Sequence, residues 1–236
     1  MSQFVENTAY SPKLVSVSQM FSTIAGRYDL TNTVLSGGMH HIWKRNLVKM
    51  IPKDGSSTIL DLCTGTGDLL VPLAKRSGTV CGADFCVPML EQASPKVDRR
   101  TNISIIQADA HKLPFEDGAF DAVTVSFGVR NFKDLEQGLS EIFRILKKNG
   151  EIIILEFGQP QNRFFRAFYD FYSAWIMPLI GGILTGNKEA YRYLPSTSKN
   201  FPCGQEFCQK LTQIGFKNPK YKLQTFGIAY LYSAEK

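Results

Sequence analysis

The chain has 236 residues, of which 44% are hydrophobic and 20% charged, and it carries a formal net charge of +6. This length and apolar share predict a single globular domain over residues 1–236 and argue against a disordered chain. The sequence contains no run of about 18 uninterrupted apolar residues, as a transmembrane helix needs, and its N-terminus has no secretory pattern. We therefore expect a cytoplasmic protein.

The five cysteines and three histidines lack the spacing of a metal site, so we expect no metal. No nucleic-acid recognition motif accompanies the basic charge, so no nucleic-acid partner is expected. The positive charge leaves open a peripheral contact with an anionic membrane face, such as the inner membrane. Composition leaves a homo-oligomer open as well.

A helical pattern over residues 18–50, broken at Ser36–Gly38, predicts an N-terminal helical cap. Strand and helix patterns then alternate over 57–157, which predicts a doubly wound, Rossmann-like parallel sheet of the α/β class. We expect strands at 58–63, 79–83, 103–107, 121–127 and 151–156, and helices at 68–76, 87–94 and 134–147. Gly150 follows the last of these helices, where a C-terminal glycine is common. Residues 219–234 predict a closing antiparallel hairpin that turns near Gly227.

An aromatic-rich insertion occupies residues 163–200. Arg166, Asp170 and Pro178 interrupt its apolar run, so we expect no membrane span there. One interpretation is a helix that covers the sheet with its aromatic side chains in the core. The other is an apolar lid over a hydrophobic substrate, in contact with a membrane. Both can hold, because a lid helix has two faces.

A glycine-bearing turn follows the first predicted strand, where Gly65 and Gly67 allow the backbone to turn sharply and approach a ligand closely. Asp84 ends the second strand and can accept hydrogen bonds from both hydroxyls of a ribose. Asp109 follows the third strand and can accept from an adenine amino group. Leu70 stands where a dinucleotide fingerprint needs a small residue. The pattern therefore favours S-adenosylmethionine over a nicotinamide cofactor. Asp61 either holds the glycine turn through backbone N–H groups or contacts the methionyl ammonium of the cofactor.

More specific motifs flank this turn. Residues of the segment 28–44 match an N-terminal signature at Tyr28, Asp29, Asn32, Leu35, Ser36, His40 and Trp43, with Thr31 in place of the usual Met. Two further runs are Ser126–Asn131 and Leu155–Phe157. With these motifs the chain resembles the ubiquinone/menaquinone-biosynthesis C-methyltransferase family over residues 18–234. The resemblance implies a class I S-adenosylmethionine-dependent methyltransferase fold, and it implies cofactor contacts at Thr66, Asp84, Asp109, Ala110 and Ser126.

The resemblance also implies a prenylated quinol substrate that is methylated on a ring carbon, demethylmenaquinol giving menaquinol. A quinol carbon attacks well only after a ring hydroxyl loses its proton. We expect Arg130 and Asn131 to hold the ring oxygen or a water that takes this proton. Arginine cannot act as the base at neutral pH, so its role would be electrostatic, and His40 is the second candidate.

Four alternatives remain open at this point. The acceptor could be the benzoquinol precursor of ubiquinone, or a small phenol or sterol. The fold could instead serve a nicotinamide dehydrogenase, although a Tyr-x-x-x-Lys proton relay is missing. A non-catalytic subunit could hold a lipid quinone within a biosynthetic assembly.

Overall fold

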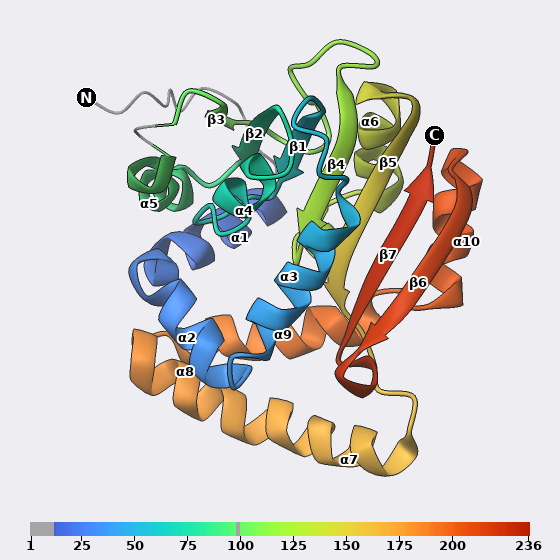
Figure 1. Ribbon diagram of the computed structural model, residues 1–236. Coiled ribbons are helices and arrows are strands. Elements are labelled where there is room, and N and C mark those ends of the chain that lie inside the picture. The colour runs from blue at the N-terminus through green and yellow to red at the C-terminus, as the bar shows by residue number, and fades with distance from the viewer. Residues whose placement is uncertain (1–11, 98–99) are drawn as a thin grey trace.

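A computed structural model describes residues 12–97 and 100–236, so the first eleven residues of the expected domain lie outside the described part. A seven-stranded sheet with the order β3-β2-β1-β4-β5-β7-β6 forms the centre (Figure 1). The first five strands pair in parallel, and β7 pairs antiparallel with both β5 and β6. The strands are β1 Thr58–Leu62, β2 Thr79–Asp84, β3 Ile103–Gln107, β4 Phe120–Ser126, β5 Leu146–Phe157, β6 Lys217–Gln224 and β7 Ala229–Glu235. The doubly wound sheet and its closing hairpin are confirmed.

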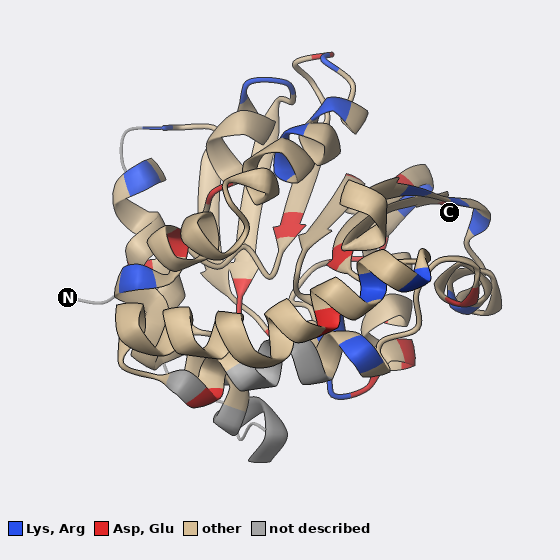
Figure 2. Ribbon diagram, turned by 90° about the horizontal axis from the view of Figure 1, so that it is seen from below, with Lys and Arg blue, Asp and Glu red and all other residues tan. Residues whose placement is uncertain are grey.

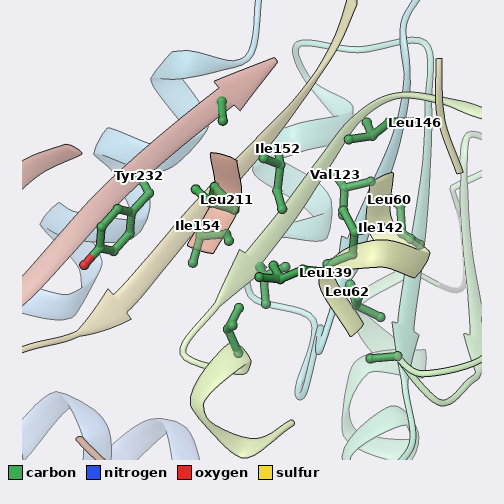
Figure 3. Close-up of a cluster of buried hydrophobic side chains, with 14 of the residues drawn as sticks. Leu60, Leu62, Val123, Leu139, Ile142, Leu146, Ile152, Ile154, Leu211 and Tyr232 are labelled. Carbon is green, nitrogen blue, oxygen red and sulfur yellow. The ribbon is translucent and has the colours of Figure 1, made fainter. Parts of the chain in front are cut away.

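Each face of the sheet buries its own apolar core, because alternate residues of a strand point to opposite faces. Ile152 and Ile154 of β5 pack with α6 (Leu135–Ile145) and α10 (Gln205–Ile214), as Figure 3 shows. Ile153 and Leu155 pack in the second core, with α3 (Met39–Met50) and α4 (Leu70–Ala74). The fully buried strands thus read as nearly continuous apolar runs, as parallel sheets require.

Some predicted boundaries were wrong. Helix α6 ends at Ile145 and β5 begins directly at Leu146, so Gly150 lies inside this strand and is no helix terminus. A Cβ on Gly150 would stand 3.0 Å from the carbonyl oxygens of both Asp121 and Lys147, which explains why a glycine is needed there. Helix α5 (Val87–Val97) continues through Pro95, beyond its expected end, and α4 is shorter than expected. Helix α10 (Gln205–Ile214) was not predicted from the sequence.

The N-terminal helices confirm the predicted cap and its break at Ser36–Gly38. They are α1 Pro12–Ile24, the 3₁₀ turn η1 Ala25–Arg27, α2 Tyr28–Leu35 and α3. The insertion forms α7 Arg163–Phe171, a π-helical segment η3 Tyr172–Ile176, α8 Met177–Thr185 and α9 Lys188–Asn200. We call α1–α3 the cap and residues 163–200 the lid. Figure 1 shows α2 and the lid helices beneath the carboxyl ends of the parallel strands, with α3 in front of the sheet.

Residues Arg163–Thr185 form one helix of 23 residues, in which Arg166, Asp170 and Pro178 interrupt the apolar run without ending the helix. Pro178 lacks an N–H and would clash in a regular helix interior, and the preceding π-helical segment accommodates it. By length and composition alone this helix could cross a membrane, although only 17% of its most apolar window is buried inside the protein.

The cap and the lid are tied to each other. The Tyr172 hydroxyl donates to the Leu35 carbonyl at 2.6 Å, and Arg27 donates to the Leu184 carbonyl at 2.6 Å. Within the lid, Gly181 packs against the ring of Tyr191, so closely that a Cβ there would overlap the ring. Two segments far apart in the sequence therefore form a single cover over the sheet edge.

Candidate active site

Two adjoining cavities lie where the carboxyl ends of β1, β2 and β4 meet the cap and lid. The first has a volume of about 280 Å³ and is bounded by side chains of the cap and the lid. The second, of about 60 Å³, lies over the ends of β2 and β3. The residues that border both cavities are Tyr28, Cys63, Gly65, Ser126 and Phe127. A ligand that occupies both cavities would pass this shared wall.

The two glycines of the predicted turn have different surroundings. Gly65 has a φ of +55°, and nothing lies within 4 Å of the position that a Cβ would take. Its backbone is therefore open to close approach by a ligand. Gly67 has a φ of +78°, but a Cβ there would stand 2.9 Å from the Cβ of Ala93 in α5. Gly67 thus permits helix packing and borders neither cavity.

Asp84 is buried at the end of β2 and borders the second cavity. Its carboxylate accepts the backbone N–H groups of Gly65 at 2.8 Å and Cys86 at 2.9 Å. It thus holds the turn, and a carboxylate has lone pairs left for two further donors. Burial raises the pKa of Asp84 to about 6. The side chain is therefore ionised at neutral pH and protonated in mild acid.

Asp109 lies near Asp84, on the wall of the same cavity as Ala110 and Asn131. Burial by itself would raise the pKa of Asp109, but hydrogen bonds from the backbone and the ring of His111, at 2.9 and 2.6 Å, lower it. The second cavity thus presents two carboxylates on adjacent strand ends, as the sequence predicted.

The floor of the first cavity begins at Asp61. The hydroxyls of Thr64 and Thr124 donate to its carboxylate at 2.6 and 2.7 Å, so it does not hold the turn through backbone N–H groups of that turn. Burial raises the pKa of Asp61 to about 6. A nearby cation would favour its ionised form, which makes this wall suited to an ammonium or sulfonium group.

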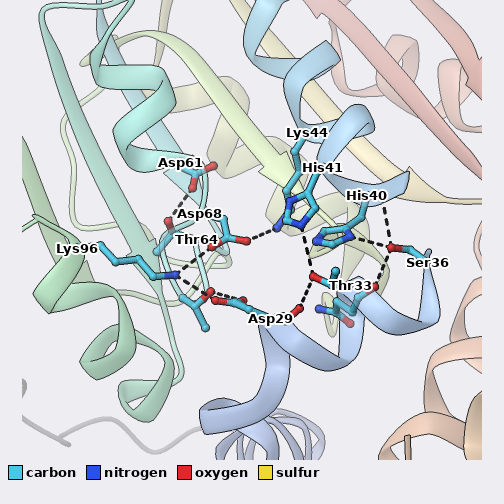
Figure 4. A network of polar contacts seen from close by, with 12 residues as sticks. Asp29, Thr33, Ser36, His40, His41, Lys44, Asp61, Thr64, Asp68 and Lys96 are labelled. Atoms are coloured by element: carbon cyan, nitrogen blue, oxygen red, sulfur yellow. Dashed lines mark hydrogen bonds and ion pairs between the residues drawn. The ribbon is translucent and has the colours of Figure 1, made fainter. Parts of the chain in front are cut away.

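A chain of ion pairs joins the cap to the glycine turn, as Figure 4 shows. Lys96 contacts Asp29 of the cap at 3.1 Å and Asp68 at 3.0 Å, and Lys44 contacts Asp68 at 3.2 Å. The Thr66 hydroxyl donates to Asp29 at 2.7 Å. The cap is therefore fastened to the turn by charge, and Thr66 takes part in this closure.

His40 borders the first cavity from α3 and is buried. The Ser36 hydroxyl donates to the Asn32 carbonyl at 2.7 Å, and the same oxygen lies 2.7 Å from His40 Nδ1. Because the hydroxyl has one proton, we assign Nδ1 as the donor, which leaves Nε2 with a lone pair. Burial, followed by the charge of Lys44, lowers the pKa of His40 to about 4. The ring is thus neutral at physiological pH.

Arg130 is held firmly at the opposite wall by the 3₁₀ turn η2 (Val129–Asn131). Its Nη1 donates to Glu156 at 2.5 Å and to the Phe127 carbonyl at 2.6 Å, and its guanidinium lies over the ring of Phe157. Both side chains of the ion pair are almost fully buried. Among the described residues, the buried Nε of Arg130 and Oγ of Ser126 have no hydrogen-bond partner. Both therefore offer hydrogen-bonding capacity to a ligand.

The structure divides the predicted site residues between the two cavities. Gly65 and Ser126 border both, and Asp84, Asp109, Ala110 and Asn131 border the second. Thr66, His40 and Arg130 border the first. Arg130 and Asn131, expected to act together on one ring oxygen, thus face different cavities.

No role for Lys44 or Glu156 was predicted from the sequence. The lid aromatics were predicted only as a group, and Phe165, Phe168, Tyr169 and Tyr172 border the first cavity. Lys44 directly follows the N-terminal signature, and Glu156 belongs to a quoted motif. Position in these motifs was therefore the available signal for both residues.

This donor set fits S-adenosylmethionine. The two carboxylates of the second cavity suit an adenosyl group. The open backbone of Gly65 and the Ser126 hydroxyl, which has no hydrogen-bond partner among the described residues, lie between the cavities. Asp61, at the first cavity, suits a cationic group. No group of three His, Cys, Asp or Glu side chains within 12–97 and 100–236 could hold a metal ion.

Comparison with solved structures shows the same architecture. An S-adenosylmethionine-dependent methyltransferase described as putative, from Methanococcus maripaludis, superimposes with a TM-score of 0.64 at 21% identity, over 99% of this chain and 97% of that one. Phosphoethanolamine N-methyltransferase 2 of Haemonchus contortus, solved with S-adenosylmethionine, gives 0.63 at 16% identity over 82% of this chain and 52% of that one. The fold is that of class I S-adenosylmethionine-dependent methyltransferases.

Sequence relatives are closer. A ubiquinone/menaquinone biosynthesis C-methyltransferase of Bdellovibrio bacteriovorus is 42% identical over 227 residues, which cover 94% of this chain and 97% of that protein. A demethylmenaquinone methyltransferase of Thermus thermophilus is 42% identical over 220 residues, covering 92% of this chain and all of that protein. The model of the ubiE/COQ5 methyltransferase family matches residues 7–236. The chain therefore belongs to the ubiE/COQ5 methyltransferase family, and its cofactor is S-adenosylmethionine.

Proposed function

We propose that this protein transfers a methyl group from S-adenosylmethionine to a ring carbon of a prenylated quinol, converting demethylmenaquinol to menaquinol. The observation that carries the proposal is the first cavity. Its outer wall is built from lid aromatics, and it meets the cofactor cavity across Gly65 and Ser126. An aromatic ring seated there would lie beside the position of the transferred group.

We assign the cofactor contacts as follows. Asp84 accepts from the ribose hydroxyls and Asp109 from the adenine amino group, because both carboxylates border the small cavity. Ala110 lines that cavity as an apolar surface. Asp61 and Thr66 border the other side of the turn, where the methionyl part would lie. The Ser126 hydroxyl gains a partner when the cofactor is present, since it has none among the described residues.

When bound, S-adenosylmethionine supplies an electrophilic methyl group on a sulfonium. The residues of the chain must make the quinol carbon nucleophilic, which requires the neighbouring hydroxyl to give up a proton. His40 Nε2 carries a lone pair toward which that proton can move. Arg130, held in place by Glu156, stabilises the negative charge on the oxygen. Once methylated, the ring carbon would lose its hydrogen as a proton and the ring oxygen would take back the proton held by His40, so that one net proton is released per turnover.

The apolar walls serve this chemistry by excluding water. Phe127 and Phe157 stack with ring centroids 4.4 Å apart, and Trp43 packs edge-on against both at 6.3 Å. In such a site the charge of Arg130 acts on the oxygen with little screening. Asn131 borders the cofactor cavity and is assigned to binding there.

The test is a transfer assay with methyl-labelled S-adenosylmethionine and a panel of acceptors: demethylmenaquinol, the benzoquinol precursor of ubiquinone, and soluble phenols. Mass spectrometry of the extracted lipid identifies the product. We expect label on demethylmenaquinol. Label on the benzoquinol alone would move the assignment to ubiquinone synthesis, and tight quinone binding without any label would indicate a non-catalytic lipid-binding subunit.

A prenylated acceptor resides in a membrane. We therefore propose a cytoplasmic enzyme that contacts the inner membrane peripherally. The alternative is a homo-oligomer in which a second copy covers the exposed apolar residues of the protein.

A further inference from the structure

The long lid helix Arg163–Thr185 exposes a continuous apolar stripe. Its large apolar side chains recur every three or four residues, as one face of a helix requires. The exposed members, here called the outer stripe, are Phe164, Phe168, Phe171, Trp175, Leu179 and Ile183. Figure 2, which views the protein from this side, shows the helix crossing the face with few charged positions. Six large apolar side chains in one row exceed the scattered exposure that is normal for a surface.

The other face of the same helix forms the wall of the first cavity, through Phe165, Tyr169 and Tyr172. Phe168 belongs to both surfaces, because it borders the cavity and is also exposed. Phe165 packs edge-on against the exposed Phe226 with ring centroids 5.2 Å apart. The apolar lining of the cavity is thus continuous with the outer stripe at this rim.

We propose that the outer stripe docks in the plane of an anionic lipid bilayer, with the rim at Phe165, Phe168 and Phe226 facing the acyl chains. This inference rests on the proposed function, because it explains how a prenylated quinol reaches the site. A cavity of about 280 Å³ lies at the lower limit of small-molecule pockets, ~300–1,000 Å³. It holds the ring but not a long tail, so the tail must extend through the rim.

The inner contacts of the helix favour an in-plane position over a membrane crossing. Gly181 is closed against the Tyr191 ring, Tyr172 is bonded to the cap, and Leu184 accepts from Arg27. A crossing would break all of these contacts. Amphipathic helices with one packed face and one apolar face bind at the interface between headgroups and acyl chains.

The charges on this face favour anionic lipid. The acidic residue within Arg163–Thr185 is Asp170, and Lys199 neutralises it at 3.3 Å. Arg163 and Arg166 lie exposed at the beginning of the helix, and Arg166 donates to the neutral Gln159. With a net charge of +6 on the whole chain, this surface is drawn to anionic headgroups.

The experiment uses the full chain with vesicles of phosphatidylglycerol and phosphatidylcholine, in a sedimentation assay. The chain has two tryptophans, and Trp175 is 71% exposed whereas Trp43 is 3% exposed. Quenching by brominated lipid therefore reports the stripe. The variants are Ile183→Glu and Phe171→Glu, neither of which borders the cavity, and the matched control is Ile42→Glu on α3, outside the stripe. Ile183 is 73% and Ile42 47% exposed.

We expect the wild type to sediment with vesicles and its fluorescence to be quenched. Each stripe variant should lose at least tenfold in vesicle partitioning, whereas Ile42→Glu stays within about twofold of the wild type. Methyl transfer to a water-soluble short-chain quinol should be unchanged in Ile183→Glu, and transfer to a vesicle-embedded long-chain quinol should fall. Unchanged circular dichroism and cofactor affinity verify folding.

Two results would overturn the docking proposal. One is vesicle binding that Ile183→Glu does not weaken. The other is a wild type that does not bind vesicles but forms a lipid-free dimer in sedimentation velocity, which Ile183→Glu dissociates. The outer stripe would then bind a second copy of the chain. Vesicle binding without methyl transfer to any quinol would instead refute the proposed function and leave docking intact.

Discussion

Replacement of Glu156 by Gln tests how the site holds Arg130. Glu156 is fully buried and accepts from Arg130 Nη1, from the Arg130 backbone at 3.2 Å and from the Phe157 backbone at 2.8 Å. The amide keeps the shape of the side chain but removes its charge, which leaves the buried guanidinium unpaired. Breaking a buried pair on one side costs about 3–5 kcal/mol. With a urea m-value of about 3 kcal/mol per M, the unfolding midpoint should fall by about 1–1.7 M.

The matched control is Asp117→Asn, which removes the exposed partner of Arg144 in a 2.8 Å ion pair. An exposed pair is worth less than about 1 kcal/mol, so its midpoint should hardly move. Urea unfolding followed by circular dichroism measures both variants. The double variant Arg130→Met with Glu156→Gln should recover part of the lost stability, because no buried charge remains unpaired. Equal midpoints for Glu156→Gln and Asp117→Asn would refute this reasoning.

Three further predictions concern protonation, catalysis and packing. The pKa of Asp84 is raised from 3.8 to about 6, so cofactor affinity measured by calorimetry should fall up to about tenfold per pH unit below 6. The folded state also binds this proton more tightly than the unfolded state does. The contribution of Asp84 to the unfolding free energy therefore falls as pH rises from 3.8 to about 6. An affinity that does not change with pH would contradict the role of Asp84. His40→Gln should lower kcat by about 10²–10⁴-fold in the labelled-methyl assay with the cofactor Kd within about twofold, and Ser36→Ala should lower kcat less; an unchanged kcat would remove His40 from the mechanism. Gly67 has a positive φ and contacts α5, so Gly67→Ala should lower the free energy of unfolding in urea by about 2–4 kcal/mol. Gly26→Ala should lower it little, because a Cβ there meets nothing within 4 Å. Similar losses for the two variants would show that packing is not the cause.

The sheet could be predicted because local patterns determine it. Buried parallel strands read as short apolar runs, and each begins and ends within about two residues of its expected place, apart from the start of β5. That start was missed because Leu146 to Gly150 follows a helix directly, and a glycine after a helix usually marks its end. The reason for Gly150, contact with the Asp121 backbone, involves a strand 29 residues earlier.

The residues of the site could be predicted, but not how they divide between the cavities. The carboxyl ends of parallel strands meet at one edge, so Asp84 and Asp109 could be placed together from the sequence. Arg130 and Asn131 are neighbours in the chain, yet a tight 3₁₀ turn directs them into different cavities. The pairing of Arg130 with Glu156 and the bond from Thr66 to Asp29 join residues 26 and 37 positions apart. No local pattern encodes such pairings.

The bonds between cap and lid have a consequence for protein engineering. The Leu35–Tyr172 and Arg27–Leu184 contacts join two segments that pack as one unit. A chimera that keeps the cap of this protein and receives only the lid of a relative would have mismatched surfaces between cap and lid, although its cofactor site is intact. Grafting both segments together should transfer the choice of methyl acceptor. The strand ends that bind the adenosyl group should still bind the cofactor in such a chimera.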